Sequence, residues 1–210
     1  MKKIKKYFTS KTIKEIALDF FYSFIWVMIL VFLFDIISKW LIVKNLTLHQ
    51  EVQVIPNFFY LHLTFNQGAA FGLGNTGDLT WRVLFIVISV VMVVGMSGYY
   101  FKNGAKMKLF MRLALALMIG GAFGNLIDRA FYWHSIVGFS GVIDFLSFEF
   151  WGWRFATFNI ADSALVVGTI LLIVSLLIED FKKEKIVKED LSKAPQEYLD
   201  ELEQKQKENE

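Results

Sequence analysis

The sequence predicts an all-α membrane protein with four transmembrane helices, a small extracytoplasmic β-sheet and an interfacial aromatic segment. First, 55% of its 210 residues are apolar, which is more than a soluble domain of this size could bury. Second, most charged residues are segregated into tails and loops. Third, crossing a hydrocarbon core of about 30 Å takes about 20 helical residues. Four apolar stretches are long enough, at about 20–43, 80–101, 109–131 and 157–179.

The distribution of lysine and arginine predicts the orientation of these spans. The first stretch is too long for a cleaved signal peptide and contains Asp35 and Lys39, so we interpret it as a retained span. Basic residues precede it and fill the link between the second and third stretches, which places both regions in the cytoplasm. We therefore expect a cytoplasmic N-terminal segment (1–19), a four-span domain (20–179) and a charged cytoplasmic tail (180–210).

Two segments, about 44–79 and 132–156, remain outside the membrane in this topology. In the first, apolar and polar residues alternate from Phe59 to Asn66, a period of two that predicts a half-buried strand. The second is rich in tryptophan and phenylalanine, which is typical of the headgroup level of a bilayer. We expect the strand to belong to a small sheet on the outer membrane surface and the aromatic segment to lie in the interface.

Polar residues from three spans and both outer segments converge on the outer layer of the membrane in this topology. A carboxylate inside a span is costly and usually faces a partner or a wet cavity, so a functional site is expected there. Its members are Asp35, Lys39, Asn66, Asn125, Asp128, Arg129, Asp144, Asn159 and Asp162.

Each of these residues also has a purely structural interpretation. Asp35 and Lys39 are four residues apart and could simply neutralise each other, which leaves their role open. An ion pair is favoured for Asp128 and Arg129, and close helix packing is enough to explain the small-residue stripe around Gly121. The chain has no cysteine, its histidines lack ligand spacing, and its net charge of +2 is too small to indicate nucleic acid.

Five sequence blocks contain the polar residues of the expected site and fit the four-span topology. The blocks are Asp35 to Lys39 (DIISK), Asn66 to Gly72 (NQGAAFG), Gly120 to Arg129 (GGAFGNLIDR), Val142 to Phe145 (VIDF) and Phe158 to Ser163 (FNIADS). In these blocks, and in their order over residues 30–175, the chain resembles the signal peptidase II family of membrane aspartyl proteases.

The resemblance implies that Asp144 and Asp162 are the catalytic pair. The segment 130–143 looks several residues longer than is usual in the family, so Asp128 is the reserve candidate for the second carboxylate. The resemblance also implies a set of residues that bind substrate or support the site. They are Asp35, Lys39, Asn66, Gly68, Gly121, Asn125, Asp128, Arg129, Asn159 and Ala161.

The implied activity is removal of signal peptides from diacylglyceryl-modified prolipoproteins by cleavage before the lipidated cysteine. Two close carboxylates resist joint ionisation, so one can act as base while the other acts as acid. We expect a monomer without cofactor or metal in a bacterial cell (inner) membrane, in contact with lipids, with its active site at the outer face. Two alternatives remain open, a small transporter with a proton relay and a scaffold whose carboxylates form only ion pairs.

Overall fold

The structure is a computed structural model that describes residues 13–68, 74, 78–131 and 141–193. The chain divides into two compact units, 1–171 and 172–210, and the boundary falls within the last helix. All the residues of the predicted site lie in the first unit. Parts of the N-terminal segment, the 66–72 block, the 130–143 segment and the tail fall outside the described residues.

The described part of the chain contains four helices that are long and apolar enough to span a membrane, as predicted. They are α3 (Ile25–Asn45), α4 (Leu79–Asn103), α5 (Leu109–Phe131) and the Ile160–Glu189 portion of α6 (Ile160–Ser192). The 3₁₀ helix η2 (Gly104–Lys106) links α4 to α5, and the short helix α2 (Ile13–Ser23) precedes α3. The first of these helices begins at Ile25, later than the predicted start near residue 20. Phe24 has a left-handed backbone (φ 54°), which separates α2 from α3.

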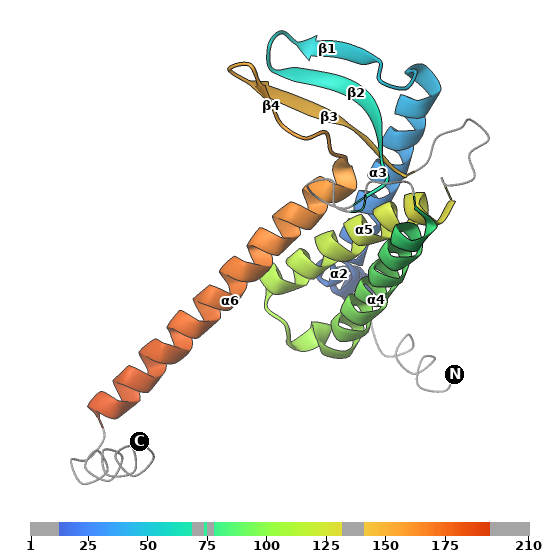
Figure 1. The fold of residues 1–210 in the computed structure, drawn as a ribbon. Coiled ribbons are helices and arrows are strands. Elements are labelled where there is room, and N and C mark those ends of the chain that lie inside the picture. Colours follow the sequence, from blue (N-terminus) through green and yellow to red (C-terminus); the bar gives the residue numbers. More distant parts are fainter. Residues whose placement is uncertain (1–12, 69–73, 75–77, 132–140, 194–210) are drawn as a thin grey trace. The chain divides into compact units, whose positions relative to one another are not determined.

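Helix α5 is the central helix of the first unit. In its most apolar window 56% of residues are buried, against 6% in α4. Small residues make this burial possible, because Gly120 meets the backbone of α3 at Met28. Figure 1 shows α3, α4 and α5 lying together. A helix whose faces contact several neighbours is well placed to present polar groups away from lipid.

A four-stranded antiparallel sheet contains the predicted strand. Its order is β1 (Glu51–Ile55), β2 (Phe59–Asn66), β3 (Val142–Phe150) and β4 (Trp153–Arg154). The described part of the aromatic segment therefore supplies two strands and does not form a separate element. Its placement in the membrane interface stays a prediction.

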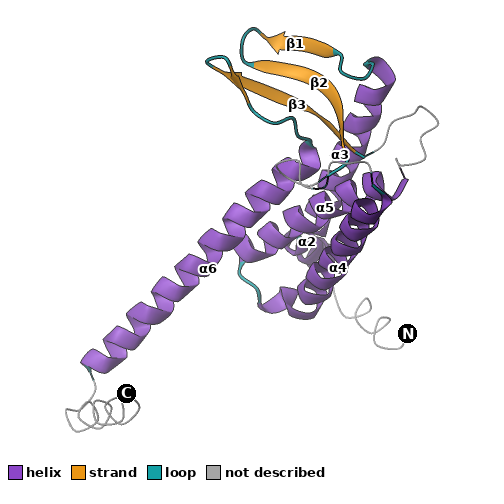
Figure 2. Cartoon of the chain, in the orientation of Figure 1, coloured by secondary structure: helices purple, strands orange, loops and turns teal. Residues whose placement is uncertain are grey.

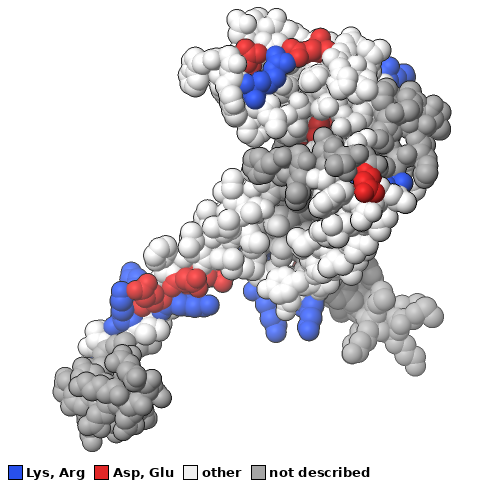
Figure 3. All heavy atoms as spheres, viewed as in Figure 1, with Lys and Arg blue, Asp and Glu red and all other residues white. Residues whose placement is uncertain are grey.

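The sheet lies at the end of the unit where α3 and α5 finish and α6 begins (Figures 1 and 2). A buried cluster joins it to α3 and contains Ile42, Leu63, Ile143 and Phe145. At the opposite end, basic side chains gather around the α4–α5 link, and Figure 3 shows them as blue groups below a largely uncharged surface. The two ends of the unit thus differ in charge, and the side of the membrane that each end faces stays a prediction.

Candidate active site

Asp162 lies in the first turn of α6, where the start of the helix determines its position. The Asp162 N–H donates to Asn159 Oδ1 at 2.8 Å, and the Asn159 N–H donates to Asp162 Oδ2 at 3.2 Å. This reciprocal pair is a capping-box arrangement, which satisfies two backbone N–H groups that a helix start otherwise leaves unpaired. The local sequence therefore orients the Asp162 carboxylate through the backbone of its own helix.

Asp144 lies on β3 and is only 2% exposed. Asn159 Nδ2 donates to Asp144 Oδ1 at 2.7 Å, and the side chain of Asn66 also hydrogen-bonds to this carboxyl group. Burial, followed by the negative charge of Asp162, raises the pKa of Asp144 to about 7. Asp144 can therefore hold a proton near neutral pH.

Asn125 connects the two carboxylates to each other. Its Nδ2 donates to Asp162 Oδ1 at 2.8 Å, and its Oδ1 accepts from Asn159 Nδ2 at 3.1 Å. Asn159 Nδ2 in turn reaches Asp144. Two amides from α5 and the start of α6 thus form a continuous hydrogen-bonded path between Asp162 and Asp144.

A buried charge cluster supports this path from the side of α3. Lys39 Nζ lies 2.6 Å from Asp35 Oδ2, 2.7 Å from Asp128 Oδ2 and 3.1 Å from Asn125 Oδ1. Asp35 and Asp128 are fully buried and Lys39 is 2% exposed. An ammonium group has three donors, so all three are used.

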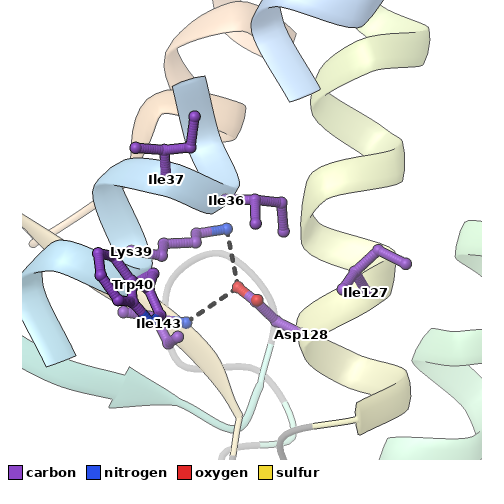
Figure 4. A pocket seen from close by; sticks show the side chains of 7 residues that line it. All are labelled: Ile36, Ile37, Lys39, Trp40, Ile127, Asp128 and Ile143. Atoms are coloured by element: carbon purple, nitrogen blue, oxygen red, sulfur yellow. Dashed lines mark hydrogen bonds and ion pairs between the residues drawn. The ribbon is translucent and has the colours of Figure 1, made fainter. Parts of the chain in front are cut away.

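A pocket of about 350 Å³ lies beside this cluster, between α3, α5 and β3. Figure 4 shows Lys39 and the backbone of Ile143 both reaching the Asp128 carboxylate. The second oxygen, Asp128 Oδ1, is buried without a hydrogen-bond partner in the part of the chain that the structure describes. The pocket is lined by Ile36, Ile37, Lys39, Trp40, Ile127, Asp128 and Ile143.

Arg129 adds positive charge near the carboxylate pair. Its charge interacts most strongly with Asp162 and next with Asp144. Its Nη2 donates to the Gly68 carbonyl at 3.5 Å, and its guanidinium lies 5.8 Å from the centre of the Phe85 ring. The Gly68 N–H donates to Asn66 Oδ1 at 3.0 Å. Arg129 therefore helps to connect the end of α5 to the segment that follows β2.

Two glycines of α5 allow the helices that carry the site to approach closely. A Cβ on Gly121 would collide with the Ala161 carbonyl, and a Cβ on Gly124 would collide with the Asp35 carboxylate. Close helix contact, which the sequence predicted for Gly121, is confirmed. Gly124 has a more specific role than packing, because its missing side chain leaves room for a buried charge.

The comparison with protein families decides which family these residues belong to. The family model described as signal peptidase (SPase) II matches residues 27–178, most of the chain. The chain belongs to the signal peptidase II family. It is therefore a protease and a multi-pass membrane protein. Membership settles the choice among enzyme, transporter and scaffold in favour of the enzyme.

Individual relatives of the signal peptidase II family agree with this assignment. A lipoprotein signal peptidase of Bacillus pumilus (strain SAFR-032) is 44% identical over 79% of this chain and 97% of its own length. One of Staphylococcus aureus (strain bovine RF122 / ET3-1) is 37% identical over 76% of this chain and 91% of its own.

Solved structures described as bacterial membrane enzymes share the fold. One matches with a TM-score of 0.65 and 30% identity, over 76% of this chain and 90% of its own. A second matches with a TM-score of 0.62 and 32% identity, over 73% of this chain and 92% of its own.

The structure brings together the polar residues that the sequence placed in one layer. The ion pair expected between Asp128 and Arg129 is absent between these two described side chains, because Asp128 pairs with Lys39 instead. Lys39 also binds Asp35, so this lysine is shared between two carboxylates and does not form a one-to-one pair. The catalytic and supporting roles themselves stay predictions.

Sequence reasoning missed the part played by backbone groups. The Ile143 N–H donates to Asp128 Oδ2 at 3.2 Å, and the Ala161 N–H donates to Asp35 Oδ1 at 2.9 Å. Main-chain donors leave no residue-type signal, so no sequence pattern could have revealed them. Among the described residues, no group of three His, Cys, Asp or Glu side chains could hold a metal ion.

Proposed function

We propose that this chain is an aspartic endopeptidase in which Asp144 and Asp162 cleave diacylglyceryl-modified prolipoproteins before the lipidated cysteine. Removal of signal peptides from prolipoproteins is the activity that the family and its lipoprotein signal peptidase members support. One observation carries the aspartic mechanism. Asp144 and Asp162 come from separate elements, yet Asn159 hydrogen-bonds to both of them.

The different surroundings of the two carboxyl groups suggest different starting roles. Asp162 accepts from Asn125 Nδ2 through Oδ1 and from the Asn159 N–H through Oδ2, so both of its oxygens act as hydrogen-bond acceptors, as suits a carboxylate base. Asp144 is more deeply buried, and its pKa of about 7 allows it to carry a proton. Asp162 is therefore the base at the start of the cycle and Asp144 is the acid.

In the first step, Asp162 removes a proton from water while the water oxygen attacks the scissile carbonyl carbon. Asp144 donates its proton to the carbonyl oxygen, which gives a neutral diol. In the second step, Asp162 returns its proton to the leaving nitrogen as the C–N bond breaks. Asp144 regains a proton from one diol hydroxyl, so both groups return to their initial states and no covalent intermediate is needed.

The proposed orientation places this chemistry at the outer face of the membrane. The site lies at the sheet end of the helices, and the basic α4–α5 link lies at the other end (Figures 1 and 3). By the positive-inside rule both termini are cytoplasmic. The scissile bond of a lipid-anchored signal segment lies at the bilayer surface, at the level of the carboxylates. We expect a monomer that receives its substrate sideways from the lipid.

Cleavage of a purified diacylglyceryl prolipoprotein in detergent tests the proposal. Asp144→Asn and Asp162→Asn should each reduce kcat by at least roughly 10³-fold, because each removes a group that transfers protons in both steps. Asp78→Asn is the matched control and should cleave normally, since the Asp78 side chain caps α4 and asparagine is an equally good N-cap. Persistent cleavage by either folded variant would show that Asp144 and Asp162 are not the catalytic pair. Loss of cleavage only in Asp128→Asn would favour Asp128 as a catalytic carboxylate.

A further inference from the structure

The buried carboxylates Asp35 and Asp128 bind the backbone next to the proposed catalytic residues. Asp35 Oδ1 accepts from the N–H of Ala161, which directly precedes Asp162. Asp128 Oδ2 accepts from the N–H of Ile143, which directly precedes Asp144. One buried carboxylate is thus attached to each of the two segments that deliver the catalytic pair.

Lys39 joins these two attachments into one bridge. Its Nζ contacts Asp35 at 2.6 Å and Asp128 at 2.7 Å, and Figure 4 shows the half of the bridge that passes through Asp128 to Ile143. The whole path runs from the first turn of α6, through side chains of α3 and α5, to β3. Such a path limits how far β3 can move from α6, and therefore how far apart Asp144 and Asp162 can lie.

Lys39 also determines the direction of the hydrogen bonds that the Asn125 and Asn159 side-chain amides make between the two carboxylates. Its third donor reaches Asn125 Oδ1 at 3.1 Å, and the same oxygen accepts from Asn159 Nδ2. An ammonium group can only donate, whereas an amide can turn over and exchange its oxygen for its nitrogen. With Lys39 in place, a flipped Asn125 would present N–H to the ammonium and oxygen to the Asp162 carboxylate. The unflipped amide therefore presents its N–H to Asp162.

We propose that Lys39 is a positioning residue that sets the spacing of Asp144 and Asp162 and orients the amides between them. It does so without touching substrate, through the bridge Ala161–Asp35–Lys39–Asp128–Ile143 and through Asn125. The proposal rests on the proposed function, because it presumes that Asp144 and Asp162 are the reacting groups. The charged groups that face the bridge and the pair are Asp35 and Lys39 from α3, Asp128 and Arg129 from α5, Asp144 from β3 and Asp162 from α6.

Removal of Lys39 itself is an ambiguous test, because Lys39→Met leaves two carboxylates buried without a counter-charge and endangers folding. Asp35→Asn and Asp128→Leu are sharper, because each leaves Lys39 paired with one carboxylate. Asp35→Asn breaks its half of the bridge, since the Ala161 N–H and Lys39 bind different oxygens of Asp35 and asparagine has only one. At Asp128 both donors share Oδ2, which an asparagine oxygen could replace, so Asp128→Leu is used to break the other half.

The experiment measures kcat and KM across pH with a diacylglyceryl prolipoprotein substrate, together with thermal unfolding in detergent. Both bridge variants should lower kcat by roughly ten- to a hundredfold and leave KM within about threefold, because the reacting groups are misplaced and the substrate contacts are intact. Asp128→Leu should also move the alkaline limb of the kcat profile, because this limb reports the acid Asp144, which directly follows Ile143.

Leu115→Ala is the control for destabilisation alone, because Leu115 is buried in a separate cluster with Tyr100 and Met107. If the bridge variants lose activity only in proportion to unfolding, with unshifted limbs as in this control, the positioning role is wrong. A rise in KM with unchanged kcat would also reject it. Asp144→Asn and Asp162→Asn are measured alongside, and activity in those two would instead reject the proposed function.

Discussion

Asp144 links the chemistry of the site to the stability of the fold. Its ordinary pKa is 3.8, and burial together with the charge of Asp162 raises the pKa to about 7. The folded chain therefore holds this proton more tightly than the unfolded chain does. By linkage, the stabilisation is complete below pH 3.8 and is lost as the pH rises through about 7.

Asp144→Asn should remove this pH dependence, because an amide does not ionise. We expect the Tm of the wild type to fall relative to that of Asp144→Asn between pH 4 and pH 8, by about a few degrees. Thermal unfolding in detergent at both pH values measures the difference. Parallel curves for the two proteins would show that Asp144 does not titrate in this range.

Residue types alone could predict which side chains gather at the site but not which of them pair. Asp35 and Lys39 were visible as neighbours on one helix because they are four residues apart. The contact between Lys39 and Asp128 joins α3 to α5 and depends on how the two helices pack. The sequence favoured a structural ion pair for Asp128 and Arg129, whereas the packing of α3 against α5 gives Asp128 to Lys39.

At the scale of the elements, α5 depends on glycine to reach its neighbours. Gly121→Ala should force α5 away from Ala161, which lowers stability by about 1–3 kcal/mol and reduces kcat by roughly tenfold. Gly98 in α4 is the matched control, since a Cβ there meets nothing within 4 Å. Gly98→Ala should be neutral or slightly stabilising in the same unfolding and cleavage assays. Equal effects of the two substitutions would show that the close contact at Gly121 is unimportant.

The helices were easier to predict than the sheet, for a physical reason. A span needs only a long apolar run, which is a local property, although the break at Phe24 occurs without glycine or proline and left no signal. The paired residues of β2 and β3 are at least 76 positions apart in the sequence, from Asn66 and Val142 upward. The aromatic side chains of β3 are equally compatible with a segment in the membrane interface. Pairing of distant strands is not encoded in either segment alone.

At the scale of the whole molecule, the proposed mechanism needs the sheet end of the first unit to face outward. The charge difference between its two ends supports this orientation, since the α4–α5 link carries Lys102, Lys106, Lys108 and Arg112. The four spans were predictable from apolar length, and the location of both termini in the cytoplasm stays a prediction from the basic loops. The contacts among α3, α5, β3 and α6 that bring the site residues together were not predictable from the sequence.

The absence of cysteine from the sequence makes this orientation directly measurable. Thr47→Cys places one thiol at an exposed position between α3 and β1, and Lys106→Cys places one at an exposed position in the α4–α5 link. A membrane-impermeant maleimide added to protoplasts or spheroplasts should label Thr47→Cys at once, but Lys106→Cys only after lysis. The wild type is the unlabelled control, and both variants should still cleave substrate. The reverse labelling pattern would place the carboxylates on the cytoplasmic side, where a lipid-anchored precursor exposed at the outer surface could not reach them.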